Sequence, residues 1–295
     1  MEGDGGAPAC HNTRDAPALG WMDAEVRMTR WTIALGLGSV WMACADPPAD
    51  AGDPGDTAGL TDTADVADTD PTTDAPVDSD PADCAPPDVP DDATARSLPY
   101  LTLTGSTDDG VSAWLGVPYA APPVGDRRFR APAAPACVDT VLAATASGPL
   151  CPQHADDGTI VGEEDCLHLN VWAPDDAEEA PVMVWLHGGG HQQGGAGVTV
   201  AGGDLLYDGT GLAERGVVVV AANYRLGVLG YLAHPSIEDA TQGTGNLGTL
   251  DQLAVLRWVQ DHIATFGGDP TQVTVAGQSA GGVSTCRLAT LPAAD

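Results

Sequence analysis

The stretch VTVAGQSAGG, residues 273–282, decides the fold, because an apolar run, a tight turn and the start of a predicted helix follow one another in it. The turn reads G-x-S-x-G with Ser279 at its centre. Such a strand-to-helix turn projects the serine hydroxyl outward, and its glycines stand where Cβ atoms would collide. The N-terminus of the following helix adds a positive dipole and free N–H groups beside that hydroxyl. In so glycine-rich a chain the motif also fits an ordinary loop, but its place between a strand and a helix favours a serine nucleophile.

A second glycine-rich turn, His187-Gly188-Gly189-Gly190, follows the apolar run of residues 181–186. Three consecutive glycines expose backbone N–H groups that can face a substrate oxygen. A flexible linker is the alternative, although linkers rarely abut a buried strand. The turn precedes the Ser279 motif, as an oxyanion loop does in this kind of hydrolase.

Periodicity predicts a sheet in which strands and helices alternate. The four valines of residues 217–220 form a continuous apolar run, which is typical of a strand covered on both faces. Residues 100–105 and 111–116 alternate apolar and polar positions across Asp108-Asp109-Gly110, which predicts an antiparallel hairpin. The other predicted strands are 167–173, 181–187 and 273–276, and the predicted helices are 250–266 and 280–290. This order predicts an α/β fold.

From about residue 111 onward the chain resembles the type-B carboxylesterases, a family that includes cholinesterases, bile-salt lipases and bacterial para-nitrobenzyl esterases. The resemblance rests on many blocks in one order. They are LGVPYA at 115–120, PPVG at 122–125, RF at 128–129, EDCL at 164–167, LNV at 169–171, HGGG at 187–190, NYRLG at 223–227, GNLG at 245–248, DQ at 251–252, FGGDP at 266–270 and the Ser279 turn.

This resemblance implies an α/β-hydrolase fold, of which the chain holds the N-terminal half of the mixed central sheet, with an antiparallel hairpin at its start. It implies hydrolysis of small-molecule carboxylic esters through an acyl-enzyme on Ser279, without a cofactor or a metal. Gly189, Gly190 and Ala280 align with the oxyanion-hole amides of the family. The remaining assigned residues are a disulfide between Cys151 and Cys166 and a structural ion pair between Arg128 and Glu164.

Three positions depart from the family pattern. Gln278 replaces the glutamate usually found beside the nucleophile, and His191 replaces the common phenylalanine after the glycine run, which makes the acyl pocket more polar. Between Cys151 and Cys166 there is no aromatic residue, whereas cholinesterases place a choline-stacking tryptophan there. Cation–π recognition of a quaternary ammonium is therefore not expected.

The base and acid of the expected triad are the largest departure, since both follow the serine in this hydrolase order. All seven histidines precede Ser279, and Asp295 is the only acid after it; the histidines are at 11, 154, 168, 187, 191, 234 and 262. We therefore expect an incomplete and inactive N-terminal fragment, with residues 273–276 left as an exposed sheet edge. The alternative is a non-catalytic surface module for adhesion on the same fold, and the intact serine turn favours the esterase.

The charge distribution divides the chain into three segments. The net charge is −31, from 42 acidic and 11 basic residues, and residues 46–95 contain 15 aspartates and no basic residue. Repelling like charges, with too little apolar surface to bury, predict a disordered, extended linker at 46–95. The acidity excludes nucleic acid as a partner and electrostatic docking to an anionic membrane. The folded esterase domain is then 96–295, and its oligomeric state stays open.

Residues 1–45 resemble an upstream extension followed by a lipoprotein signal, with the true start at Met28. Residues 31–45 form an uncharged run after Arg30 that fits the apolar region of a secretory signal and is short for a membrane span. The run contains Trp41-Met42-Ala43-Cys44, which resembles a bacterial lipobox, so Cys44 is expected to be lipidated. A buried apolar helix is the alternative. The expected location is the bacterial cell envelope, or otherwise secretion.

The cysteines match no zinc-site spacing, because the chain has no C-x₂-C pair. An exported protein can form disulfides. Cys137 and Cys286 are expected to be unpaired and partly buried.

Overall fold

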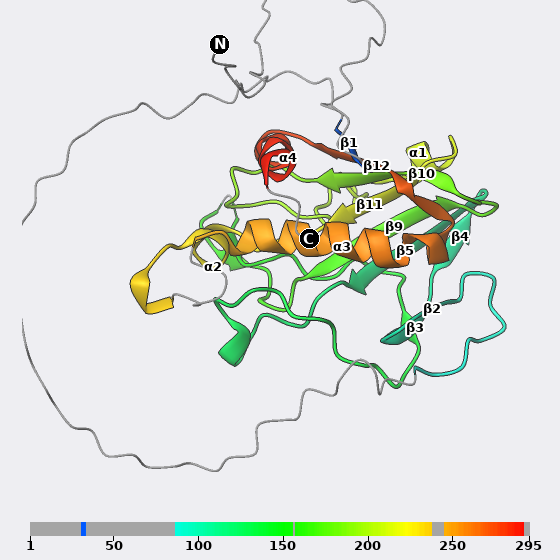
Figure 1. Ribbon diagram of the computed structural model, residues 1–295, viewed down its shortest axis with the longest axis horizontal. Coiled ribbons are helices and arrows are strands. Elements are labelled where there is room, and N and C mark those ends of the chain that lie inside the picture. Colours follow the sequence, from blue (N-terminus) through cyan, green and yellow to red (C-terminus); the bar gives the residue numbers. More distant parts are fainter. Residues whose placement is uncertain (1–30, 34–85, 156, 238–244, 292–295) are drawn as a thin grey trace, which may run out of the picture.

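The computed structural model describes residues 31–33, 86–155, 157–237 and 245–291, built around a seven-stranded mixed sheet (Figure 1). The strand order is β1-β12-β10-β11-β9-β5-β4. β1, β12, β10 and β11 run parallel, whereas β9, β5 and β4 extend the sheet in antiparallel pairs. The bounds are β1 Trp31–Ile33, β4 Ser106–Asp108, β5 Val111–Pro118, β9 His168–Pro174, β10 Ala180–Leu186, β11 Val218–Ala222 and β12 Gly268–Gly277.

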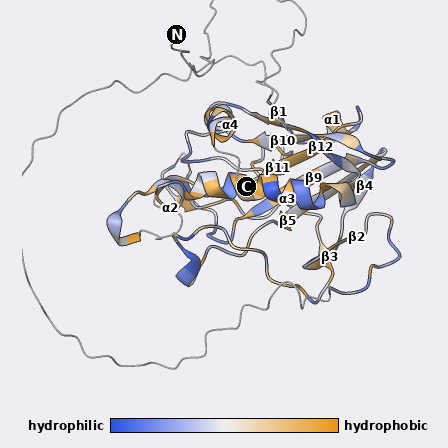
Figure 2. Ribbon diagram, in the orientation of Figure 1, coloured by the Kyte–Doolittle hydropathy of each residue, from blue (hydrophilic) through white to orange (hydrophobic). Residues whose placement is uncertain are grey.

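Helices cover this sheet and connect its strands. The long helix α3 crosses one face of the sheet, and α4 follows directly on β12 (Figure 1). Both apolar and polar residues lie around α3, as Figure 2 shows, so that one side of the helix packs inward. The bounds are α1 Thr210–Ala213, α2 Gly227–Tyr231, α3 Leu247–His262, α4 Ala280–Thr290, and the 3₁₀ turns η2 Gly125–Arg127, η3 Pro235–Ile237 and η4 Ile263–Phe266.

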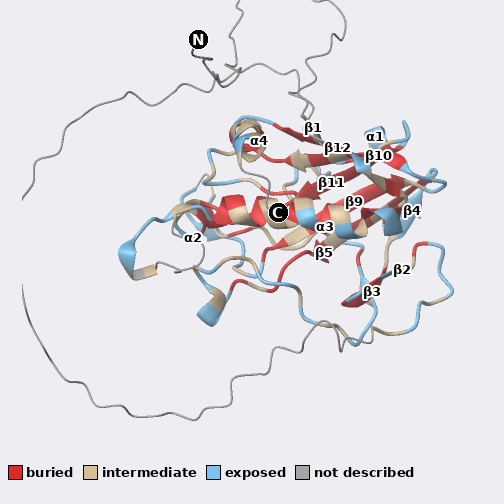
Figure 3. Cartoon of the chain, in the orientation of Figure 1, coloured by how far each residue is buried: buried red, intermediate tan, exposed pale blue. Residues whose placement is uncertain are grey.

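Both faces of the central strand β11 are buried, as Figure 3 shows. Val218 and Val220 of β11 point into the large core shared with α3, while Val219 points into a smaller core with Trp172 and with Ala213 of α1. Successive side chains of a strand face opposite sides of the sheet. The continuous valine run is therefore explained by two apolar layers, and the prediction of a doubly covered strand is confirmed.

An antiparallel hairpin forms at the predicted turn, but the prediction that residues 100–105 are its first strand is wrong. β5 pairs with β4 across Asp109 and Gly110, both of which have positive φ, 48° and 85°. β3 Leu101–Thr104 belongs instead to a separate three-stranded sheet with β2 Arg96–Leu98 and β6 Leu142–Ala143. β3 and β4 therefore belong to different sheets. Between them, the Gly105 N–H donates to Thr94 Oγ1 at 2.9 Å and not to β5.

The domain begins before residue 96. Thr94 is buried, and its carbonyl accepts a 2.7 Å hydrogen bond from Trp114 Nε1. Pro87 O accepts another, at 2.6 Å, from Thr102 Oγ1. Backbone carbonyls make these bonds, so composition alone gives no sign of them. Residues 86–95, assigned above to the disordered linker, therefore pack on the domain, whereas residues 46–85, Met28 and Cys44 lie outside the described residues.

The edge of β12 is also occupied. Trp31–Ile33, which falls in the expected export signal, forms β1 and pairs in parallel with residues 273–275. The expectation that this edge would be exposed is wrong, because the open N–H and C=O groups of an edge strand pair with another extended segment. Within the described ranges, no helix is long and apolar enough to span a bilayer.

Candidate active site

Ser279 occupies a strained turn between β12 and α4. Its backbone has φ 54° and ψ −120°, a conformation that L-residues rarely adopt and that costs about 1–3 kcal/mol. The hydroxyl does not cap α4, and the residue is exposed. The turn therefore holds the Ser279 Oγ outward, available to a ligand.

Close packing between α4 and β10 explains the second glycine of the motif. A Cβ at Gly281 would lie within 3 Å of backbone atoms of Leu186 and His187. Any side chain there would push α4 away from the end of β10. The glycine therefore keeps the serine turn and the glycine loop in contact.

Strand register brings the two predicted turns together. β10 and β12 are parallel, and Leu186 stands opposite Gly277, so both strands end at one edge of the sheet. Just beyond that edge, a Cβ built on Gly188 would lie 3.2 Å from Ser279 Cβ. β10 lies between β11 and β12, where the strand order reverses, and ligands of open α/β sheets bind in the crevice at such a point.

The glycine loop beside this crevice contains backbone N–H groups without a described acceptor. Gly189 and Gly190 have φ values of 106° and 64°, which favour glycine, and the Gly189 carbonyl accepts from the N–H groups of Gln192 and Gln193 at 3.0 and 3.1 Å. In the described part of the chain, the N–H groups of Gly189, Gly190 and Ala280 donate to no acceptor. These three donors are available to a substrate oxygen.

His187 supports the glycine loop by packing. Its buried ring stacks on Tyr224 with centroids 4.2 Å apart, and the Tyr224 hydroxyl donates to His187 O at 2.7 Å. Burial lowers the pKa of His187 to about 4, so the imidazole is neutral at neutral pH. The sequence alone gave no sign of this ring pair.

No base among the described residues is paired with the serine. The Ser279 hydroxyl has no hydrogen-bond partner among the described residues. His191 Nε2 lies 2.9 Å from Ser284 Oγ instead, and His262 packs against Tyr100 and Trp258 with ring centroids 6.0 and 5.6 Å apart. The described site therefore combines an exposed serine hydroxyl with unpaired backbone N–H groups, and no group that could hold a metal lies within the described ranges.

A cleft of about 400 Å³ adjoins the glycine loop. One wall comes from the loop that carries β7 Gln153–His154 and β8 Ile160–Val161, and the other from Val198, Leu206 and Tyr207. Among the described residues, no Asp, Glu or Arg side chain lines it. Its chemistry suits an uncharged group.

The structure joins Cys151 and Cys166 in a disulfide that closes this loop, with a sequence separation of 15. A crosslink over such a loop contributes about 3 kcal/mol to stability in the chain-entropy model. Beside it, Arg128 Nε donates to Glu164 Oε2 at 2.6 Å, with the side chains 46% and 28% exposed. The disulfide and the ion pair fix the loop that forms one wall of the cleft.

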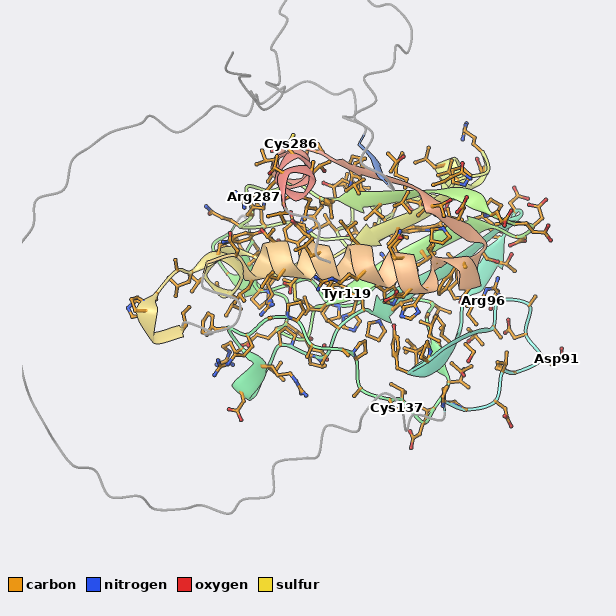
Figure 4. The ribbon with its side chains drawn as sticks, in the orientation of Figure 1. Asp91, Arg96, Tyr119, Cys137, Cys286 and Arg287 are labelled. Carbon is orange, nitrogen blue, oxygen red and sulfur yellow. A yellow bond between two sulfur atoms is a disulfide. The ribbon has the colours of Figure 1, made fainter. Side chains whose placement is uncertain are left out.

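The expectation for Cys137 is wrong, because this residue is disulfide-bonded. Cys286 is a half-buried thiol on α4, where Figure 4 labels it. A pairing that joins distant segments leaves no periodic signal in the sequence.

A buried ion pair behind the site was missed by the sequence analysis. Asp251 of α3 accepts from Arg225 through both oxygens, at 2.8 Å from Nε and 2.7 Å from Nη2, and also from the Arg225 backbone N–H at 3.0 Å. The two side chains are 0% and 3% exposed. The pair ties the segment after β11 to α3. Both residues fall in the sequence blocks that carried the resemblance, and those blocks were the only sequence feature that pointed to them.

Comparison with known proteins agrees with this geometry. A profile described as "Carboxylesterase family" matches residues 100–295. The para-nitrobenzyl esterase of Bacillus subtilis (strain 168) is 48% identical over 203 residues, which cover 66% of this chain and 40% of the relative. The fumonisin B1 esterase of Sphingopyxis macrogoltabida is 44% identical over 190 residues, covering 62% of this chain and 34% of the relative.

Solved structures agree as well. A para-nitrobenzyl esterase superposes with a TM-score of 0.62 at 45% identity, covering 69% of this chain and 42% of that one. A carboxylesterase of Geobacillus stearothermophilus gives 0.58 at 41% identity, covering 68% and 41%. The chain thus spans between 34% and 42% of these relatives' length and carries the corresponding part of an α/β-hydrolase fold. On the profile match and these relatives, the chain belongs to the carboxylesterase family.

Proposed function

We propose that Ser279 is the nucleophile of a serine carboxylesterase and forms an acyl-enzyme with small, uncharged carboxylic esters. The contact that carries this proposal is the one between Gly188 and Ser279, since it brings the free N–H groups of the glycine loop to the serine. A role in adhesion alone does not require a strained, exposed serine beside the N–H groups of the glycine loop.

In the proposed reaction, Ser279 Oγ attacks the carbonyl carbon of the ester and its proton passes to a base. The carbonyl electron pair moves to the oxygen, and the N–H groups of Gly189, Gly190 and Ala280 stabilise that oxyanion. Collapse expels the alcohol, which takes the proton from the base, and water then releases the acid by the same steps. We propose that the base and its acid come from outside the described residues.

Tests of turnover therefore need that base. We would supply it by joining residues 86–295 to the carboxyl-terminal part of the Bacillus subtilis para-nitrobenzyl esterase, and we call the product the chimeric esterase. Its activity toward para-nitrophenyl acetate provides the reference for each variant.

Two neighbouring glycines provide a matched test of the oxyanion loop. A Cβ at Gly189 would lie within 3 Å of the Gln193 backbone, whereas a Cβ at Gly190 would meet nothing within 4 Å. We expect Gly189→Ala to lower kcat/KM of the chimeric esterase by about 10²–10³, because the loop must move and its donors are misplaced. Gly190→Ala keeps the N–H in place and should cost less than about tenfold. Equal, small losses in both variants would contradict the assigned donors.

We also propose that the protein is exported and anchored to the cell envelope through a lipid on Cys44. The uncharged run before Cys44 and the lipobox-like residues support this proposal. Cys44→Ser should move the product from the membrane fraction to the soluble fraction. An unchanged distribution would mean that the cysteine is incidental.

Processing at Cys44 and pairing of β1 are mutually exclusive in one mature molecule. Cleavage before Cys44 removes Trp31–Ile33, and the edge of β12 then loses its partner. The N-terminal sequence of the mature protein therefore distinguishes processing at Cys44 from retention of β1. A mature chain that still contains Trp31 would overturn the lipid anchor.

A further inference from the structure

A chain of three polar side chains links the glycine loop to both helices behind the site. His191 ends the loop with φ 57°, and its Nε2 lies 2.9 Å from Ser284 Oγ on α4. Ser284 is 1% exposed and accepts a 3.0 Å hydrogen bond from Gln252 Nε2 of α3. Gln252 is itself fully buried. The loop that carries the oxyanion donors is thus bonded to the helix that starts at the serine turn.

These bonds allow a neutral imidazole to accept from Ser284. Because the Gln252 amide donates to Ser284 Oγ, the hydroxyl hydrogen of Ser284 can donate onward to His191 Nε2. An acceptor at Nε2 places the ring proton on Nδ1. The backbone of His191 is held too, since its carbonyl accepts from the Gly227 N–H at 2.7 Å.

We propose that His191 is a positioning residue whose neutral ring clamps the glycine loop to α4 through Ser284, so that the loop donors stay aligned with Ser279. The catalytic consequence rests on the proposed function, whereas the clamp is a property of this fold. His191 stands where the family commonly has phenylalanine, which can fill space there but cannot make this bond.

The surroundings of His191 make the clamp dependent on pH. Burial, and then the charge of Arg287 on α4, lower the pKa of His191 below its ordinary value of 6.5, while the Ala280 backbone opposes the shift. Figure 4 labels Arg287 on this helix. His187 faces His191 from the glycine loop, and the ring centroids of Tyr224 and Tyr231 lie 6.2 and 5.0 Å from that of His191.

Protonation would turn Nε2 into a donor, leave the Ser284 hydroxyl hydrogen without its acceptor and set a cation against Arg287. Since the native pKa is depressed, the stabilisation is complete above pH 6.5 and is lost as the pH falls through the lower native pKa.

Hydrogen exchange of the full chain tests the clamp without requiring turnover. The reporters are the amides of Gln192 and Gln193, which donate to Gly189 O, and of Gly227, which donates to His191 O. At pH 7.5 we expect His191→Phe and Ser284→Ala to lower their protection by about tenfold, the effect of one lost hydrogen bond. Thr285→Ala, which removes a hydroxyl that donates to Gly281 O in the same helix, is the matched control and should leave them unchanged.

The pH profile separates positioning from mere packing. Wild-type protection, corrected for intrinsic exchange, should fall by about tenfold as the pH is lowered from 7.5 through the depressed native pKa of His191. His191→Gln, whose amide oxygen can accept from Ser284 but does not titrate, should keep the protection and lose the pH dependence. Amides of β10 and β11 should remain protected throughout, which shows that every variant is folded.

Equal protection in wild type and His191→Phe, or the same pH profile in wild type and His191→Gln, would overturn the clamp. A protein that shows the clamp but never forms an acyl-enzyme would instead contradict the proposed function alone.

Discussion

Ser279→Ala is expected to lower kcat of the chimeric esterase for para-nitrophenyl acetate by at least about 10⁴-fold. Without Oγ there is no atom to form the acyl-enzyme, and only the oxyanion donors and binding remain. Thr271→Ala is the matched control, because this exposed hydroxyl lies near the other end of β12. Turnover of the control should stay within about twofold of the reference.

Residues 1–295 by themselves should hydrolyse the same ester no faster than their own Ser279→Ala variant, because no described base is bonded to the serine. Ser279-dependent turnover by this chain would contradict that expectation. It would place the base within the chain, and His191, bonded to Ser284 on the helix that begins at the serine turn, would be the first histidine to replace.

The largest expected effect on stability is at Asp251. Asp251→Ala leaves Arg225 as a buried cation whose partner is gone, and breaking a buried pair on one side costs about 3–5 kcal/mol. Urea unfolding of the chain should show this loss in the free energy of unfolding. The Arg215–Glu214 pair is the control, since its side chains are 71% and 50% exposed and its removal should cost about 0–1 kcal/mol.

A double replacement distinguishes pairing from packing. Arg225→Met combined with Asp251→Leu removes both charges and should recover part of the loss. A loss below about 1 kcal/mol for Asp251→Ala would mean that water reaches the site and that the pair does not hold α3 to the segment after β11.

Local patterns were sufficient for the elements that carry the site. The bounds predicted for α4 agree with Ala280–Thr290, because the serine turn marks its start. The apolar runs of β10, β11 and β12 were recognised because all three strands contribute to the large core, and β11 also to the smaller one. α3 was placed within a few residues, although it begins at Leu247 and its last predicted turn is the 3₁₀ segment η4.

Contacts between segments distant in the sequence could not be predicted from local patterns. The register of Leu186 opposite Gly277 creates the contact between the two turns, and no local pattern specifies it. The pairing of β1, the disulfide at Cys137 and the Arg225–Asp251 ion pair also join distant segments. The resemblance to a family supplied the expected roles at the site, and the structure supplied the distances.

Mass mapping of the chimeric esterase after reaction with a fluorophosphonate tests the nucleophile most directly. An activated serine oxygen attacks the phosphorus of the probe and displaces fluoride. One phosphonyl group should therefore be found on the tryptic peptide of residues 258–287. Fragmentation should place it on Ser279 and not on Ser284, and Ser279→Ala should take up none. An adduct on any other residue, or full ester hydrolysis by Ser279→Ala, would contradict the assignment of Ser279 as the nucleophile.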